Sequence, residues 1–133
     1  MESRLEREKN FHDQAYSENL RAAVGNYYVA TRSCWDYYRD MLKTHGYGRR
    51  VLEYGCGAGS YAFILAQHGA AVTGIDISTI AIQQARAAAA QAGLPIEFHE
   101  MNAEQLEFAD GSFDLICGTG ILHHLDLAKA KSR

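Results

Sequence analysis

The chain contains few of the residues that mark specialised protein classes. It has one proline and three cysteines among its 133 residues. The cysteines, Cys34, Cys56 and Cys117, show no C-x-x-C spacing, which predicts neither a disulfide framework nor a zinc site. We therefore expect reduced thiols and a cytoplasmic location. No apolar run approaches the roughly 20 residues that span a bilayer, so we expect no membrane partner.

Positive charge is also scarce. Lysine and arginine number 13 against 16 aspartates and glutamates, which gives a formal net charge of −3. A nucleic-acid-binding domain normally carries a basic patch, and Arg49-Arg50 is the one compact basic pair in the sequence. We therefore expect no nucleic-acid partner. The hydrophobic fraction of 47% and the charged fraction of 22% are those of an ordinary globular domain.

Helix and strand patterns alternate along the chain. Helices are expected over residues 1–17, 26–44, 61–67 and 79–92, and strands over residues 51–54, 71–76, 95–99 and 112–117. Asp126 is expected to open a further helix. Four strands alternating with helices predict a parallel, Rossmann-like α/β sheet with right-handed crossovers and helices on both faces. The first two helices form an N-terminal helical extension to this sheet.

The rest of the chain is organised around the stretch 51–61, VLEYGCGAGSY. Apolar residues lead into Gly55, Gly57 and Gly59, and an amphipathic run follows, which predicts a strand, a tight turn and a helix. Glycine permits positive φ and lets a ligand approach the backbone closely. The free N–H groups at the start of the helix suit anionic or strongly polar ligand groups. Asp76 follows about 20 residues later, the spacing of a ribose-binding carboxylate in a nucleotide-binding unit.

The spacing of the glycines separates two kinds of nucleotide ligand. The dinucleotide fingerprint is G-x-G-x-x-G or -A, and its last position is Ser60 here. Glu53 lies inside the preceding strand, where a carboxylate would meet the negative charge of a pyrophosphate in a poorly solvated crevice. A ligand with an ammonium group suits it better. A nicotinamide-dependent oxidoreductase is therefore a disfavoured alternative.

At this point the sequence resembles the class I S-adenosylmethionine-dependent methyltransferases, whose first motif is similar to VLEYGCGAG. The resemblance covers about residues 50–127. It implies S-adenosylmethionine as the cofactor, bound beyond the carboxyl ends of the strands. The implied cofactor-binding residues are Glu53, Tyr54, Gly55, Cys56, Gly57, Gly59, Asp76, Ile77, Asn102, Ala103, Gly118 and Thr119.

The resemblance also implies a role for each part of this set. Glu53 would favour the methionine ammonium, unless it only pairs with Arg49 or Arg50. Asp76 would accept hydrogen bonds from the ribose hydroxyls, and Ile77 would pack on the adenine. Further along the chain, Asn102 and Ala103 would hold the adenine edge, although many relatives carry aspartate at position 102. Gly118 and Thr119 would lie near the sulfonium.

His123 and His124 follow the fourth predicted strand. Either could serve as a general base toward an acceptor hydroxyl, or could simply pack and hydrogen-bond. Adjacent histidines are a poor metal motif and no other ligands cluster near them in sequence, so we expect no metal. Cys56 has no basic partner nearby in sequence and is interpreted as a small turn residue and not a nucleophile.

The sequence divides into residues 1–48, an N-terminal helical cap segment, and residues 49–133, the S-adenosylmethionine-binding domain. The aromatic side chains of the cap segment pack the helices onto the sheet, or they cover the cofactor and contribute to an acceptor pocket. Phe11, Tyr16 and Tyr27 are the candidates for the second role.

The resemblance implies methyl transfer to a small-molecule acceptor. The family normally continues through further strands, so the chain is expected to be an N-terminal fragment or a truncated form. Its fourth strand would then be an exposed edge, through which self-association is possible. A non-catalytic nucleotide-binding or interaction module is the alternative.

Overall fold

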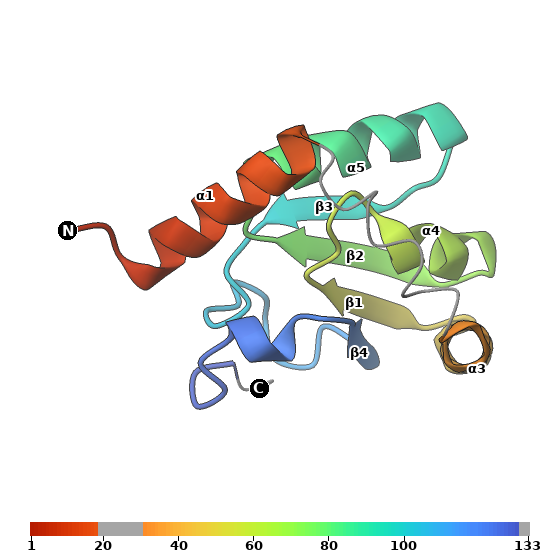
Figure 1. Cartoon of the computed structure of the whole chain (residues 1–133). Helices are drawn as coiled ribbons and strands as arrows, with labels where there is room; N and C mark the ends of the chain where they lie inside the picture. The colour runs from red at the N-terminus through yellow and green to blue at the C-terminus, as the bar shows by residue number, and fades with distance from the viewer. Residues whose placement is uncertain (19–30, 131–133) are drawn as a thin grey trace.

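The computed structural model describes residues 1–18 and 31–130. Four strands form one parallel sheet: β1 (Arg50–Tyr54), β2 (Ala71–Asp76), β3 (Glu97–Glu100) and β4 (Leu115–Gly118). Their order is β3-β2-β1-β4 (Figure 1). The chain therefore changes direction across the sheet between β1 and β4, as expected for a Rossmann-like fold. Such a switch point is where open parallel sheets bind ligands.

Three helices cover one face of this sheet. They are α3 (Arg32–Gly46), α4 (Ser60–Gln67) and α5 (Thr79–Ala92). Their inward residues pack on the alternate residues of β1 and β2 that point to this side. The buried core on this face consists of Leu42, Val51, Cys56, Ala62, Leu65, Val72, Ile82, Ala85, Ala89 and Phe98. The burial of β-branched residues on the central strands is the main reason that the sheet forms here.

Two helices end with well-defined caps. Ser78 caps α5 at its start, because its hydroxyl accepts the backbone N–H of Ala81 at 3.1 Å. Gly93, with φ of 66°, ends the same helix in the left-handed conformation. Gly69 (φ 87°) follows the C-cap of α4.

The opposite face is covered differently. The connection after β3 and the short 3-10 helix η2 (Leu122–His124) pack over Leu52, Tyr54, Ile75 and Ala103. The partly buried residues on this side are Met101, Leu106, Phe108, Phe113, Ile121 and Leu125. Among the described residues, η2 is therefore the helical element on this face.

The first helix, α1 (Arg4–Ser17), lies across α5 beside the carboxyl ends of β2 and β3 (Figure 1). Its start carries a capping box formed by Ser3 and Glu6. Ala15 is its one buried residue, so polar contacts attach it to the domain. Lys9 Nζ donates to Ile77 O at 3.2 Å and to Glu100 Oε1 at 2.7 Å.

Two further side chains complete the attachment of α1. Asp13 Oδ1 accepts the Ser78 hydroxyl at 2.5 Å and the Ile80 N–H at 3.2 Å. At the start of the helix, Arg4 Nη2 donates to Glu104 Oε1 at 2.5 Å and Arg4 Nη1 to His124 O at 3.0 Å. These contacts place the inner face of α1 over the carboxyl edge of the sheet.

Two of the predicted helices are only partly seen in the described residues. The second predicted helix starts at Arg32 in the structure, and the predicted residues 26–30 lie outside the described part of the chain. From Asp126 the described residues form a single turn, in which Asp126 O accepts the N–H groups of Lys129 at 2.9 Å and Ala130 at 3.0 Å, and residues 131–133 of the predicted helix lie outside the described part. The N–H of Asp126 bonds to Glu104 Oε1 at 2.8 Å, and its own Oδ1 accepts the Ala128 N–H at 3.1 Å, so the side chain stabilises a turn.

No helix in the described ranges 1–18 and 31–130 is both long enough and apolar enough to cross a membrane.

Candidate functional site

The glycine turn connects β1 to α4 in a left-handed backbone conformation. Gly55, Gly57 and Gly59 have φ of 59°, 55° and 101°. Residues with a side chain rarely adopt these values, which explains the alternating glycines. Two backbone hydrogen bonds fix the turn, from Cys56 N to Ile75 O at 3.0 Å and from Gly59 N to Cys56 O at 2.9 Å.

Asp76 ends β2 and bonds directly to this turn. Its Oδ2 accepts the Gly57 N–H at 2.9 Å, and its Oδ1 accepts the Ser78 N–H at 2.8 Å. A carboxylate oxygen has two acceptor sites, so each oxygen keeps one for a ligand hydroxyl. The carboxylate is therefore held in place and still able to accept a diol.

A cavity lies at the carboxyl ends of the strands, between the sheet edge, α1 and η2. Seven of the predicted site residues line it: Gly55, Asp76, Ile77, Asn102, Ala103, Thr119 and His124. The helix α1 contributes Arg4, Leu5, Glu8, His12 and Tyr16 to the same lining. Of these five α1 residues, only Tyr16 is predicted from the sequence. The spacing of Glu8 and His12, one helical turn apart, places them on the same face of the helix but does not show which face turns toward the site.

A second, wider cavity adjoins the first on the side of α3 and α4. Tyr16, Gly55, Thr119 and Gly120 line both cavities. The predicted residues Cys56 and Gly59 line the second one. The remaining predicted residues, Glu53, Tyr54, Gly57, Gly118 and His123, line neither of these two cavities.

Tyr16 separates the two cavities at the glycine turn. A Cβ placed on Gly57 would lie 2.1 Å from the Tyr16 hydroxyl oxygen, so that hydroxyl sits directly against the turn. Of the other aromatic residues predicted to reach an acceptor pocket, Phe11 is 60% exposed and lines neither cavity. Tyr27 lies outside the described residues.

Glu53 is buried on β1 without a compensating cation. It is 3% exposed, and its Oε2 has no hydrogen-bond partner among the described residues. Burial, and secondly the charge of Asp76, raise the pKa of Glu53 to about 8. The alternative that Glu53 pairs with Arg50 is not what the structure shows, because Arg50 Nη2 contacts Asp114 Oδ1 at 2.9 Å instead.

Cys56 is buried at 1% exposure, and desolvation raises the pKa of its thiol far above the usual range. A thiol that resists ionisation is a poor nucleophile. This agrees with its interpretation as a small residue of the turn.

The residues after β3 form the far wall of the first cavity. Asn102 Oδ1 accepts the Glu104 N–H at 3.0 Å, which fixes the orientation of the Asn102 side chain. Ala103 is buried at 7% exposure and packs with Leu52, Tyr54 and Ile75. The two predicted adenine-binding positions therefore lie in a rigid segment of the cavity wall.

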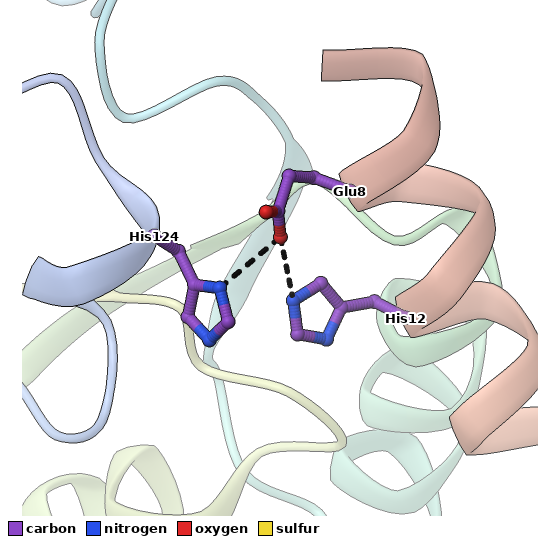
Figure 2. Close-up of side chains that lie close together, drawn as sticks. All are labelled: Glu8, His12 and His124. Atoms are coloured by element: carbon purple, nitrogen blue, oxygen red, sulfur yellow. Dashed lines mark ion pairs between the residues drawn. The ribbon is translucent and has the colours of Figure 1, made fainter. Parts of the chain in front are cut away.

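His124 lies beside two polar side chains of α1. Its Nδ1 is 3.1 Å from Glu8 Oε2, and His12 Nε2 is 3.6 Å from the same oxygen (Figure 2). No other ligand-type side chains cluster near the histidine pair in sequence, but in the folded chain Glu8 and His12 lie beside His124. Glu8 and His12 are more than 100 residues away in sequence, and only the docking of α1 brings them to His124.

The fold and the site together define a nucleotide-binding α/β domain. The glycine turn and the strand-end acid Asp76 fit a ligand that carries a ribose. The buried Glu53 Oε2, which has no hydrogen-bond partner among the described residues, fits an ammonium group, so the two together suit S-adenosylmethionine. The sequence pattern of the methyltransferase domain family matches residues 51–132, and the chain belongs to this family. The prediction of a methyltransferase domain is confirmed by this match, and S-adenosylmethionine as its cofactor follows from the family.

Two proteins of known function show the sequence similarity. The chain is 42% identical over 80 residues to the ubiquinone biosynthesis O-methyltransferase of Paracidovorax citrulli, covering 59% of this chain and 34% of that protein. It is 34% identical over 99 residues to the enzyme of the same name from Brucella anthropi, covering 74% of this chain and 40% of that protein. The chain thus spans less than half the length of these curated relatives.

Solved structures show the same fold. The YcgJ protein of Bacillus subtilis is 33% identical with a TM-score of 0.63, over 68% of this chain and 40% of that one. Magnesium protoporphyrin IX methyltransferase from Synechocystis, solved with bound S-adenosylhomocysteine, is 21% identical with a TM-score of 0.79. That match covers 96% of this chain and 65% of that protein. At this lower identity the similarity is evidence for the fold alone.

Proposed function

We propose that this chain carries the cofactor site of a methyltransferase that transfers a methyl group from S-adenosylmethionine to a hydroxyl oxygen of a small molecule. The observation that carries the proposal is the cavity at the strand ends. One wall holds the predicted cofactor residues Gly55, Asp76 and Asn102, and the other holds the polar side chains of Glu8 and His124. The names of the curated relatives support an oxygen acceptor.

The residues divide between two tasks in this proposal. Asp76 accepts hydrogen bonds from the ribose diol with its remaining acceptor sites, and the segment at Asn102 holds the adenine. Glu53 lies beneath the turn, where its ionised form stabilises the ammonium group. The sulfonium supplies an activated methyl group, so the protein mainly has to align the reactants and exclude water.

The N-terminal segment 1–48 acts as the cap of this site. Tyr16 lies against Gly57, and the polar attachment of α1 lets the helix close over the cofactor without a large apolar interface. His124 faces the cavity and accepts the proton of the acceptor hydroxyl in this scheme. His123 does not line the cavity, so we assign it no step.

Calorimetric titration of the purified chain with S-adenosylhomocysteine tests the cofactor part of this proposal. We expect saturable binding that Asp76→Ala abolishes, while NAD gives no heat under the same conditions. Asp110→Ala is the matched control, because Asp110 is an exposed aspartate that lines neither the first nor the adjoining cavity. A folded chain that binds NAD in preference to S-adenosylhomocysteine would contradict the proposal.

The acceptor is tested separately, with radiolabelled S-adenosylmethionine and a panel of phenols and catechols. Methyl transfer to oxygen that His124→Ala slows at least tenfold supports the assignment. Tight cofactor binding without transfer to any hydroxyl compound would favour the alternative of a non-catalytic binding module.

A further inference from the structure

We propose that Glu8, His12 and His124 form a binding site for a divalent transition-metal ion at the edge of the cofactor cavity. Each of the three offers one ligand atom, and these atoms all lie within 4.8 Å of one another. Glu8 and His12 come from one face of α1, and His124 comes from η2 (Figure 2). The site joins the two elements that enclose the cavity.

The spacing of the ligand atoms is close to what a metal requires. Ligands at about 2.0–2.2 Å from a tetrahedral zinc ion lie roughly 3.3–3.6 Å from one another. Glu8 Oε2 is 3.6 Å from His12 Nε2, which is within this range, and 3.1 Å from His124 Nδ1, which is slightly shorter. The ligand nitrogens of the two histidines lie within 4.8 Å of each other, so metal binding requires them to approach by no more than about 1.5 Å.

The donor set determines the class of metal. Two imidazole nitrogens and one carboxylate oxygen suit zinc, iron(II), cobalt or nickel, whereas magnesium and calcium prefer oxygen ligands alone. The three side chains are half-buried, with 30%, 12% and 26% of their surfaces exposed for Glu8, His12 and His124. An ion at this position is therefore partly desolvated and open to the cavity.

A simple ion pair explains this arrangement less well. An ion pair that joins α1 to η2 needs only one histidine beside Glu8, but the imidazoles of both His12 and His124 approach the same oxygen of Glu8. Two imidazolium ions there would repel each other, whereas two neutral imidazoles both present lone pairs to a cation. The nearby guanidinium of Arg4 is already held by Glu104 and by the carbonyl oxygen of His124.

Three protein ligands leave a coordination position open, as in catalytic zinc sites. All three ligands line the first cavity, so the open position faces a small molecule bound there. The role of the ion rests on the proposed function: with the ion bound, His124 is a ligand in place of the base, and the coordinated acceptor hydroxyl gives up its proton to water more readily than a free one. The binding site itself does not depend on that role.

Cobalt(II) is the probe, because a four-coordinate cobalt site absorbs visible light much more strongly than the hydrated ion. The full chain is purified without a histidine tag, and all proteins carry Cys34→Ser, which removes the exposed thiol as a competing ligand. Cobalt(II) is titrated into the chain and then displaced with zinc. Circular dichroism verifies that each variant is folded.

We expect one cobalt(II) ion per chain, displaced by zinc. His12→Ala and His124→Ala should each weaken the affinity by at least about tenfold, as the loss of a ligand does. Alanine favours the helix at position 12, so this variant keeps α1 intact. His99→Ala is the matched control, because His99 Nε2 lies 3.5 Å from Glu97 Oε2 in a similar pair elsewhere. It should leave the cobalt affinity unchanged.

Two results would overturn the proposal. One is the absence of saturable cobalt(II) binding by the folded chain. The other is an affinity that the His12 and His124 variants leave unchanged, or that His99→Ala lowers as much as they do. Titration with S-adenosylhomocysteine in the presence of EDTA measures cofactor binding independently of metal binding. Cofactor binding without cobalt binding defeats the metal site alone, and the reverse result defeats the proposed function alone.

Discussion

The carboxylate of Asp76 accepts the backbone N–H of Gly57 at 2.9 Å, which joins the end of β2 to the turn after β1. The other oxygen of Asp76 accepts the Ser78 N–H at the start of α5. One side chain therefore fixes both the glycine turn and the entry to the next helix. A group that holds the backbone in this way affects both the stability of the domain and its ligand affinity.

We expect Asp76→Ala to lower the free energy of unfolding by about 2 kcal/mol or more, because two hydrogen bonds to a charged acceptor are lost. Affinity for S-adenosylhomocysteine should fall by at least about 100-fold, since two further hydrogen bonds to the ribose disappear. Urea denaturation and calorimetry measure the two effects. Asp110→Ala should change neither, and equal losses in both variants would contradict the role of Asp76.

Glu53 should make the stability of the domain depend on pH. Its pKa is raised to about 8 in the folded chain, against an ordinary value of 4.5. The folded state therefore binds the Glu53 proton more tightly than the unfolded state does. The resulting contribution to the free energy of unfolding is fully present below about pH 4.5 and is lost as the pH rises through 8. The slope between these values is at most about 1.4 kcal/mol per pH unit.

Glu53→Gln tests this dependence, because glutamine keeps the shape of the protonated carboxyl group and does not ionise. We expect the variant to be more stable than the wild-type chain at pH 9 and to lose the slope between pH 5 and 8. Urea unfolding at several pH values gives the result. A slope that persists unchanged in the variant would assign the dependence to other groups.

Gly57→Ala should loosen α1. The added methyl group meets the Tyr16 hydroxyl, and the positive φ costs about 1–2 kcal/mol in addition. Gly111→Ala is the matched control, since Gly111 also has positive φ (73°) but no atom lies within 4 Å of its added Cβ. Hydrogen exchange of the α1 amides should become faster in the first variant only. Protection of α1 that is equal in both variants would show that Tyr16 does not anchor the helix at the turn.

The pKa of Asp114 should lie well below that of an ordinary aspartate. Hydrogen bonds from the side chain and the backbone of Arg50 lower the pKa of Asp114 to about 2. Carboxyl NMR titration measures this value directly. Arg50→Met should return the pKa part of the way toward 3.8, because the backbone N–H of residue 50 still donates to Asp114, whereas Arg49→Met should move it much less, because Arg49 acts only through its charge. An unchanged pKa in Arg50→Met would contradict the assignment.

The sheet and much of the proposed cofactor site can be predicted from local features of the sequence. The alternating glycines at 55, 57 and 59 require a left-handed turn, and Asp76 follows at the end of the next strand. These are local features, because residues near a strand end reach the carboxyl edge of a parallel sheet whatever else packs around it. Seven predicted residues line one cavity for this reason. At Asp126 the described residues form one turn, in which the N–H groups of Lys129 and Ala130 bond to the Asp126 carbonyl oxygen.

The side chains of α1 that face the site depend on long-range packing and cannot be predicted from the local sequence. The charged pattern of this helix is not strongly amphipathic, and its position depends on ion pairs and hydrogen bonds from Arg4, Lys9 and Asp13 to residues far along the chain. Contacts over such sequence distances leave no local signal. The meeting of Glu8 and His12 with His124, and of Tyr16 with Gly57, therefore follows from the docking of one helix on the folded sheet.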